Sequence, residues 1–100
     1  MSLNNVIRML DEEIATWYPH PGKRMQMWKF EMASYRRWAI EECRRYLLQN
    51  SDWPPVIAME NFRALMDEAA CEATTASQNY TFSIAYDIAT EVLDMIRRMD

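Results

Sequence analysis

The chain has 100 residues, of which 50% are hydrophobic, and it carries a net charge of −4. This length allows one domain, residues 1–100, and the ordinary apolar fraction excludes collagen-like and intrinsically disordered chains. Two cysteines are too few for a disulfide scaffold, and one glycine is too few for the turns of an all-β fold. The composition therefore predicts a small acidic domain that is nearly all helical.

The sequence also indicates a location. No stretch reaches the about 20 apolar residues that a membrane-spanning helix needs. The N-terminus lacks the charged segment and apolar run of a signal peptide, and the two cysteines fit free thiols in a reducing compartment. We therefore expect a cytoplasmic protein that does not contact the membrane.

The first two helices are predicted from hydrophobic periodicity. Apolar residues recur at helical spacing over residues 3–18, behind the candidate N-cap Ser2. Residues 19–22, Pro-His-Pro-Gly, end this helix and leave His20 in a solvated loop. A second helix is expected over residues 23–49, which contain neither proline nor glycine inside the pattern. Its predicted core stripe consists of Met25, Trp28, Met32, Tyr35, Ala39, Cys43 and Tyr46.

The last two helices follow a proline pair. Pro54 and Pro55 suit a helix start, where a missing N–H costs nothing, and the pattern extends to residue 73. Its predicted stripe is Met59, Phe62, Leu65, Met66, Ala69 and Ala73. A polar linker at residues 74–79 leads to a fourth helix over residues 80–99, with the stripe Phe82, Ala85, Tyr86, Ala89, Val92, Leu93 and Ile96.

Short connections favour antiparallel neighbours, so the expected fold is an all-α, four-helix up-down bundle. The competing arrangement is a three-helix core against which the first helix packs as an arm.

The second helix has more apolar residues than one stripe requires. On a helical wheel Met27, Phe30 and Trp38 fall away from the expected core stripe. A helix that is apolar on two sides is either packed on both sides within its own domain or meets a partner with one of them. In the second interpretation these three residues anchor an interface with another protein or with a second copy of the chain.

Charge is unevenly distributed along the chain. Residues 23–50 hold seven Lys and Arg against three Glu, a net charge of +4, so the other residues together carry −8. One interpretation is internal complementarity with the acidic third and fourth helices. The other is a docking face for an acidic partner, with Arg37, Arg44 and Arg45 as its rim. A nucleic-acid-binding regulator that uses these arginines is the alternative, although the pI of about 5.0 argues against it.

The sequence contains no pattern typical of an enzyme. One His and two distant Cys cannot make a zinc site, and the paired Glu-x-x-His motifs of a di-iron bundle are missing. Cys43 lies on an expected core stripe, whereas Cys71 is expected to be a surface thiol. We therefore predict no catalytic residue, no metal, no cofactor and no small-molecule substrate.

Two segments carry a resemblance. Residues 54–68, PPVIAMENFRALMDE, and residues 82–94, FSIAYDIATEVLD, resemble small uncharacterised proteins of phages and mobile elements of Gram-positive bacteria. The resemblance implies an accessory or anti-defence protein that binds a larger host protein, and it assigns no role to any residue. Together with the surface of the second helix, it predicts a non-enzymatic helical interaction module whose partner is a protein or a second copy of the chain.

Overall fold

The computed structural model describes the backbone of residues 2–16 and 27–99, and the side chains of residues 2–16 and 32–99. It contains four helices: α1 (Leu3–Thr16), α2 (Met27–Gln49), α3 (Pro55–Glu72) and α4 (Ala76–Met99). The described residues form no strand, and the helices pack against one another, so the predicted all-α four-helix bundle is confirmed.

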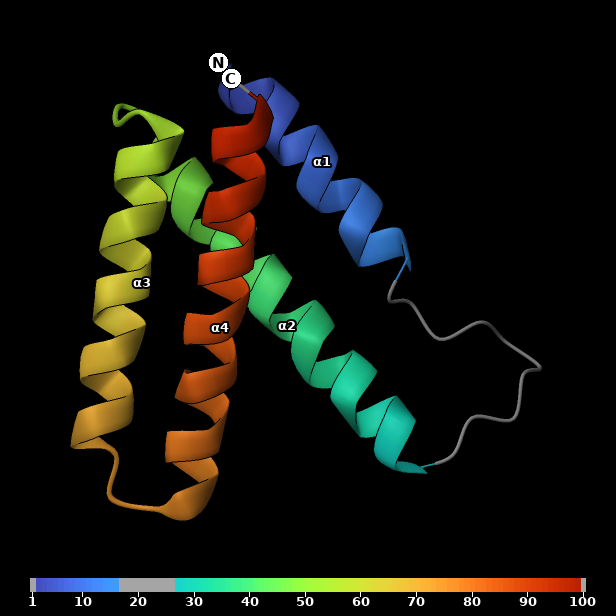
Figure 1. The fold of residues 1–100 in the computed structure, drawn as a ribbon, viewed down its shortest axis with the longest axis vertical. Helices are drawn as coiled ribbons and strands as arrows, with labels where there is room; N and C mark the ends of the chain where they lie inside the picture. The colour runs from blue at the N-terminus through green and yellow to red at the C-terminus, as the bar shows by residue number, and fades with distance from the viewer. Residues whose placement is uncertain (1, 17–26, 100) are drawn as a thin grey trace.

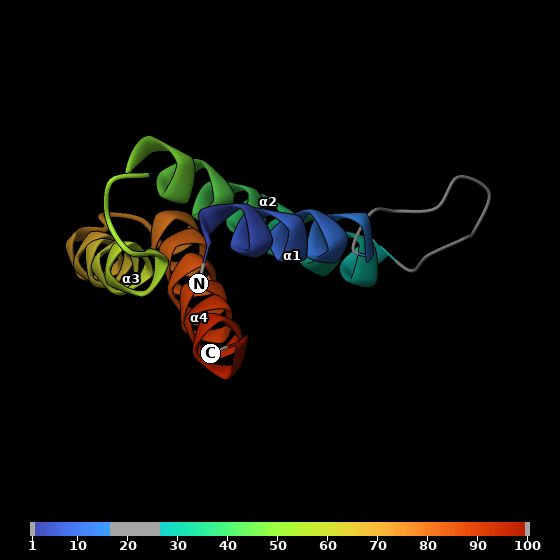
Figure 2. The same cartoon turned by 90° about the horizontal axis from the view of Figure 1, so that it is seen from above.

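The four helices form two antiparallel pairs. α1 lies alongside α2, α3 lies alongside α4, and α2 crosses behind α4 (Figure 1). Seen from above, the first pair runs across the axes of the second (Figure 2). The N-terminal half of α2 extends beyond α4, whereas α3 forms the edge of the molecule on the side away from α1 (Figure 1).

Local signals explain where α1, α3 and α4 begin. The backbone N–H of Asn5 donates to Oγ of Ser2 at 3.3 Å, which confirms Ser2 as the cap of α1. α3 begins directly after Pro54, whose ψ of 139° is extended, and Pro55 occupies its first turn. The polar linker is shorter than predicted, because α4 begins at Ala76 rather than near residue 80. There the N–H of Gln78 donates to Oγ1 of Thr75 at 3.1 Å, so Thr75 caps α4.

The core lies between the two pairs, and every helix contributes to it. α1 supplies Val6 and Leu10, both fully buried, so the first helix is part of the same core as the other three. The core cluster consists of Val6, Leu10, Ala39, Ile40, Cys43, Leu47, Ala58, Met59, Phe62, Ile88, Ala89, Val92, Leu93 and Ile96.

The predicted stripe of α4 is buried or half-buried, but it omitted Ile88, which lies in the core cluster. The stripes of α2 and α3 need larger corrections. Ala39 and Cys43 are buried as expected, but Met32 is 58% exposed, and Ile40 and Leu47 are buried in the core. The reason is that α2 contacts α1 on one side and α3 and α4 on another, so two helix pairs together decide which side of it is buried.

In α3, Leu65 was expected in the core and is 42% exposed. Ala58, which the predicted stripe omitted, is fully buried. Of the other predicted residues, Trp17, His20 and Met25 lie outside the described residues, as does the side chain of Trp28.

Candidate interaction surface

In one of the two interpretations of the second helix, Trp38 anchors an interface together with Met27 and Phe30. The structure places it half-buried, with its side chain packed against the core cluster. Met27 and Phe30 lie in the first turn of α2, but their side chains lie outside the described residues. The structure therefore describes the side chain of only one of the three predicted anchors, and that side chain packs against the core.

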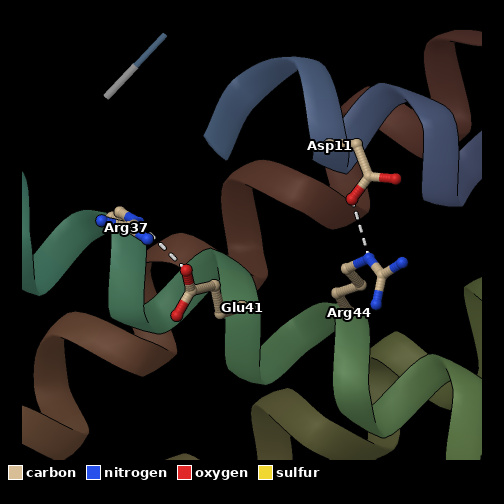
Figure 3. A network of polar contacts seen from close by, with 4 residues as sticks. All are labelled: Asp11, Arg37, Glu41 and Arg44. Atoms are coloured by element: carbon tan, nitrogen blue, oxygen red, sulfur yellow. Dashed lines mark hydrogen bonds and ion pairs between the residues drawn. The ribbon is translucent and has the colours of Figure 1, made fainter. Parts of the chain in front are cut away.

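The arginines predicted as the rim are all paired with carboxylates. Nε of Arg44 lies 2.7 Å from Oδ1 of Asp11 on α1, and Nε of Arg37 lies 3.0 Å from Oε1 of Glu41, one turn along α2 (Figure 3). Arg45, whose side chain is 63% exposed, pairs with Glu42. Exposed ion pairs of this kind contribute little to stability, but they offset most of the positive charge that a docking surface would need.

Ion pairs also connect the helices. Arg36 on α2 makes two contacts with the carboxylate of Glu91 on α4, one of them 3.3 Å between Nη1 and Oε1. Nη2 of Arg97 on α4 lies 2.8 Å from Oε1 of Glu60 on α3. Together with the contact between Arg44 and Asp11, these pairs support internal complementarity. The acidic partners of α2 lie on α1 and α4, rather than on α3 and α4 as expected.

A different group of apolar side chains is exposed. Leu48 at the end of α2, Trp53 in the following turn and Ile57 in the first turn of α3 are 44%, 43% and 51% exposed. We call these three residues the α2–α3 corner. They lie within ten consecutive residues, and the N–H of Trp53 donates to the carbonyl oxygen of Asn50 at 3.0 Å, which closes the turn. The corner places three large apolar side chains, each about half exposed, close to one tight connection.

The sequence held a signal for this corner. Leu48 and Ile57 both lie off the predicted core stripes, and Trp53 stands in a polar turn directly before two prolines. A large apolar residue in such a turn does not belong to the apolar side of any helix, so its exposure could be inferred. The excess of aromatic residues on α2 directed the prediction to Trp38 instead.

Reactive groups do not gather at any described site. Among residues 2–16 and 32–99 no group of three or more His, Cys, Asp or Glu is placed to hold a metal ion. Burial, and to a smaller extent the nearby charge of Glu42, raises the pKa of the Cys43 thiol to about 12. Cys43 is therefore a protonated core residue at neutral pH, whereas Cys71 is exposed on α3.

Comparisons of the chain with protein-family models, with curated proteins and with solved structures found no match. The resemblance of residues 54–68 and 82–94 to phage proteins therefore stays a prediction. No helix within the described residues combines the length and the apolar character needed to cross a membrane.

Proposed function

We propose that this chain is a non-enzymatic interaction module that binds another protein through the α2–α3 corner. The observation that carries the proposal is the exposure of Leu48, Trp53 and Ile57 around one turn. Large exposed apolar patches on a folded domain mark interaction sites, and Trp is enriched among the residues that dominate binding energy. A host protein bound by a phage or mobile-element accessory protein is the partner that the resemblance suggests.

The corner also has the rigidity that an interface favours. Ala58, Met59 and Phe62 hold the first two turns of α3 in the core, and Leu47 holds the last turn of α2. The exposed residues are thus fixed to buried neighbours on both sides of the turn. Binding would order few additional groups, which lowers its entropic cost.

The proposed function is tested by replacing two corner residues and measuring partner capture. In the variant Trp53→Ser with Ile57→Ser, we expect capture of a host protein to fall at least tenfold, because two apolar anchors are lost. Tagged variants are used as baits in quantitative affinity purification, and binding of each recovered protein is then measured with purified components. Met32→Ser is the control, since Met32 is 58% exposed and lies 16 residues before Leu48 on α2, away from the corner.

Far-UV circular dichroism should be unchanged in both variants, because all three residues are exposed. Capture that survives in the corner variant, or that falls equally in Met32→Ser, would remove the corner from the interface. Binding of nucleic acid instead of protein would favour the alternative regulator, although Arg37, Arg44 and Arg45 already pair with carboxylates.

A further inference from the structure

The outer side of α3 continues the corner along the edge of the molecule. Five exposed residues of α3 follow one another in steps of four and three residues: Ile57, Asn61, Leu65, Glu68 and Glu72. We call these five residues the outer stripe of α3. At 1.5 Å per residue it extends for about 22 Å. Its first part holds the apolar Ile57 and Leu65 with the polar Asn61 between them, and its last two residues are acidic. α3 packs against α4 and α2, and Nδ2 of Asn61 donates to the hydroxyl of Tyr46, so the stripe runs along the border with α2.

The acidic end of the stripe is electrostatically uncompensated. Glu68 and Glu72 make no ion pair with any described residue, and the last turn of α3 contains no base. The carbonyl groups at a helix C-terminus carry partial negative charge, so carboxylates there are less favourable than bases. By contrast Glu60, on the neighbouring side of α3, already pairs with Arg97. A cationic group placed next to this end of the stripe would therefore be electrostatically favourable.

We propose that the outer stripe, together with Trp53, binds a basic amphipathic helix of a partner protein. Apolar residues of that helix, in steps of three or four, would pack on Trp53, Ile57 and Leu65, and its bases would lie against Glu68 and Glu72. This inference rests on the proposed function and adds the chemistry of the partner. Amphipathic helices commonly bind in this way, with anchors one helical turn apart.

A separate protein fits this surface better than a second copy of the chain does. The arginines of α2 that the structure describes, 36, 37, 44 and 45, all have carboxylate partners within the chain. A second copy would have to break such pairs to present these arginines to the outer stripe, which leaves it only bases outside α2, such as the exposed Arg8 and Arg98. The net charge of −4 also disfavours close approach of two copies.

The test selects ligands without assuming their charge. A phage-displayed library of random 16-residue peptides is selected on the full chain, and enriched peptides are synthesised and titrated by fluorescence anisotropy. We expect net positive peptides with apolar residues in steps of three or four. The variant Glu68→Lys with Glu72→Lys should weaken their binding about tenfold, and added salt should weaken binding to the unmodified chain. Asp87→Lys with Asp94→Lys on α4 makes the same charge change elsewhere and should leave affinity within about twofold.

Three results would overturn the inference: neutral or acidic selected peptides, no enriched family, or affinity indifferent to the reversal at Glu68 and Glu72. A dimer in light scattering that the same reversal dissolves would assign the stripe to a second copy instead. Host-protein capture that depends on Trp53 and Ile57 but tolerates the reversal would keep the proposed function and reject the cationic helix.

Discussion

Helical spacing alone left the packing of Trp38 open between the core of its own domain and an interface. On a helical wheel it lies away from the expected core stripe, yet its side chain packs against the core cluster. Trp is long enough to reach a core that a smaller side chain at the same position would not contact. The position of Trp38 on the helical wheel therefore does not show whether its side chain is exposed. That depends on which helices lie next to α2.

The consequence is a prediction about stability. Trp38→Ala should lower the free energy of unfolding by about 1–3 kcal/mol, because it removes a half-buried aromatic side chain from the core. Urea denaturation followed by far-UV circular dichroism measures the change. Trp53→Ala is the matched control and should stay within about 0.5 kcal/mol, since Trp53 is 43% exposed in a turn.

Light scattering separates the two interpretations of Trp38. If Trp38→Ala leaves stability unchanged and alters the oligomeric mass, Trp38 belongs to an interface as the sequence predicted. We expect the reverse, with a less stable chain of unchanged mass.

At the scale of helices, the sequence predicted those features that depend on residues close to one another in the chain. The number, order and approximate ends of the helices follow from periodicity and from the proline pair at 54 and 55. The buried side of α2 could not be predicted in full, because it depends on how two helix pairs cross. The partners of Arg36 and Arg44 lie 55 and 33 residues away in sequence, so their pairing follows from that crossing and not from spacing.

The start of α4 is an exception, since a local signal for it was present. Thr75-Ala76-Ser77-Gln78 has the spacing of a capping box, in which the first and fourth residues satisfy free N–H groups. In the structure Thr75 caps the helix, and Oε1 of Gln78 lies 3.3 Å from the backbone nitrogen of Thr74, one residue before the cap. The four residues that were expected to be linker therefore extend α4 at its N-terminus.

This cap gives a prediction for α4. Thr75→Ala should destabilise the chain by about 1 kcal/mol and fray the first turn of α4, because the N–H of Gln78 loses its acceptor. Thermal unfolding measures the stability, and amide hydrogen exchange measures the fraying. Thr81→Ala is the control: its hydroxyl donates to the carbonyl oxygen of Ser77 inside the helix, where alanine is well tolerated. Equal effects at both positions would show that Thr75 does not act as a cap.

At the scale of the whole molecule, both the buried core and ion pairs connect the helices, but they contribute differently to stability. Ion pairs connect α1 to α2, α2 to α4 and α3 to α4, but all of them involve exposed side chains. Such pairs contribute about 0–1 kcal/mol each, so they set the relative register of the helices more than the stability. The stability comes from the shared core, to which each helix contributes fully buried residues.

A shared core predicts one cooperative unfolding transition that includes α1. Leu10→Ala should lower the free energy of unfolding of the entire chain by about 2–5 kcal/mol, because Leu10 is fully buried and its loss leaves a cavity. Far-UV circular dichroism and tryptophan fluorescence should give coincident urea transitions with an unchanged slope. Leu65→Ala is the control and should cost less than about 1 kcal/mol, since Leu65 is 42% exposed. If α1 were a packed arm, Leu10→Ala would produce a separate early transition in circular dichroism. The main transition would then keep the midpoint of the unmodified chain, because the other three helices would unfold without it.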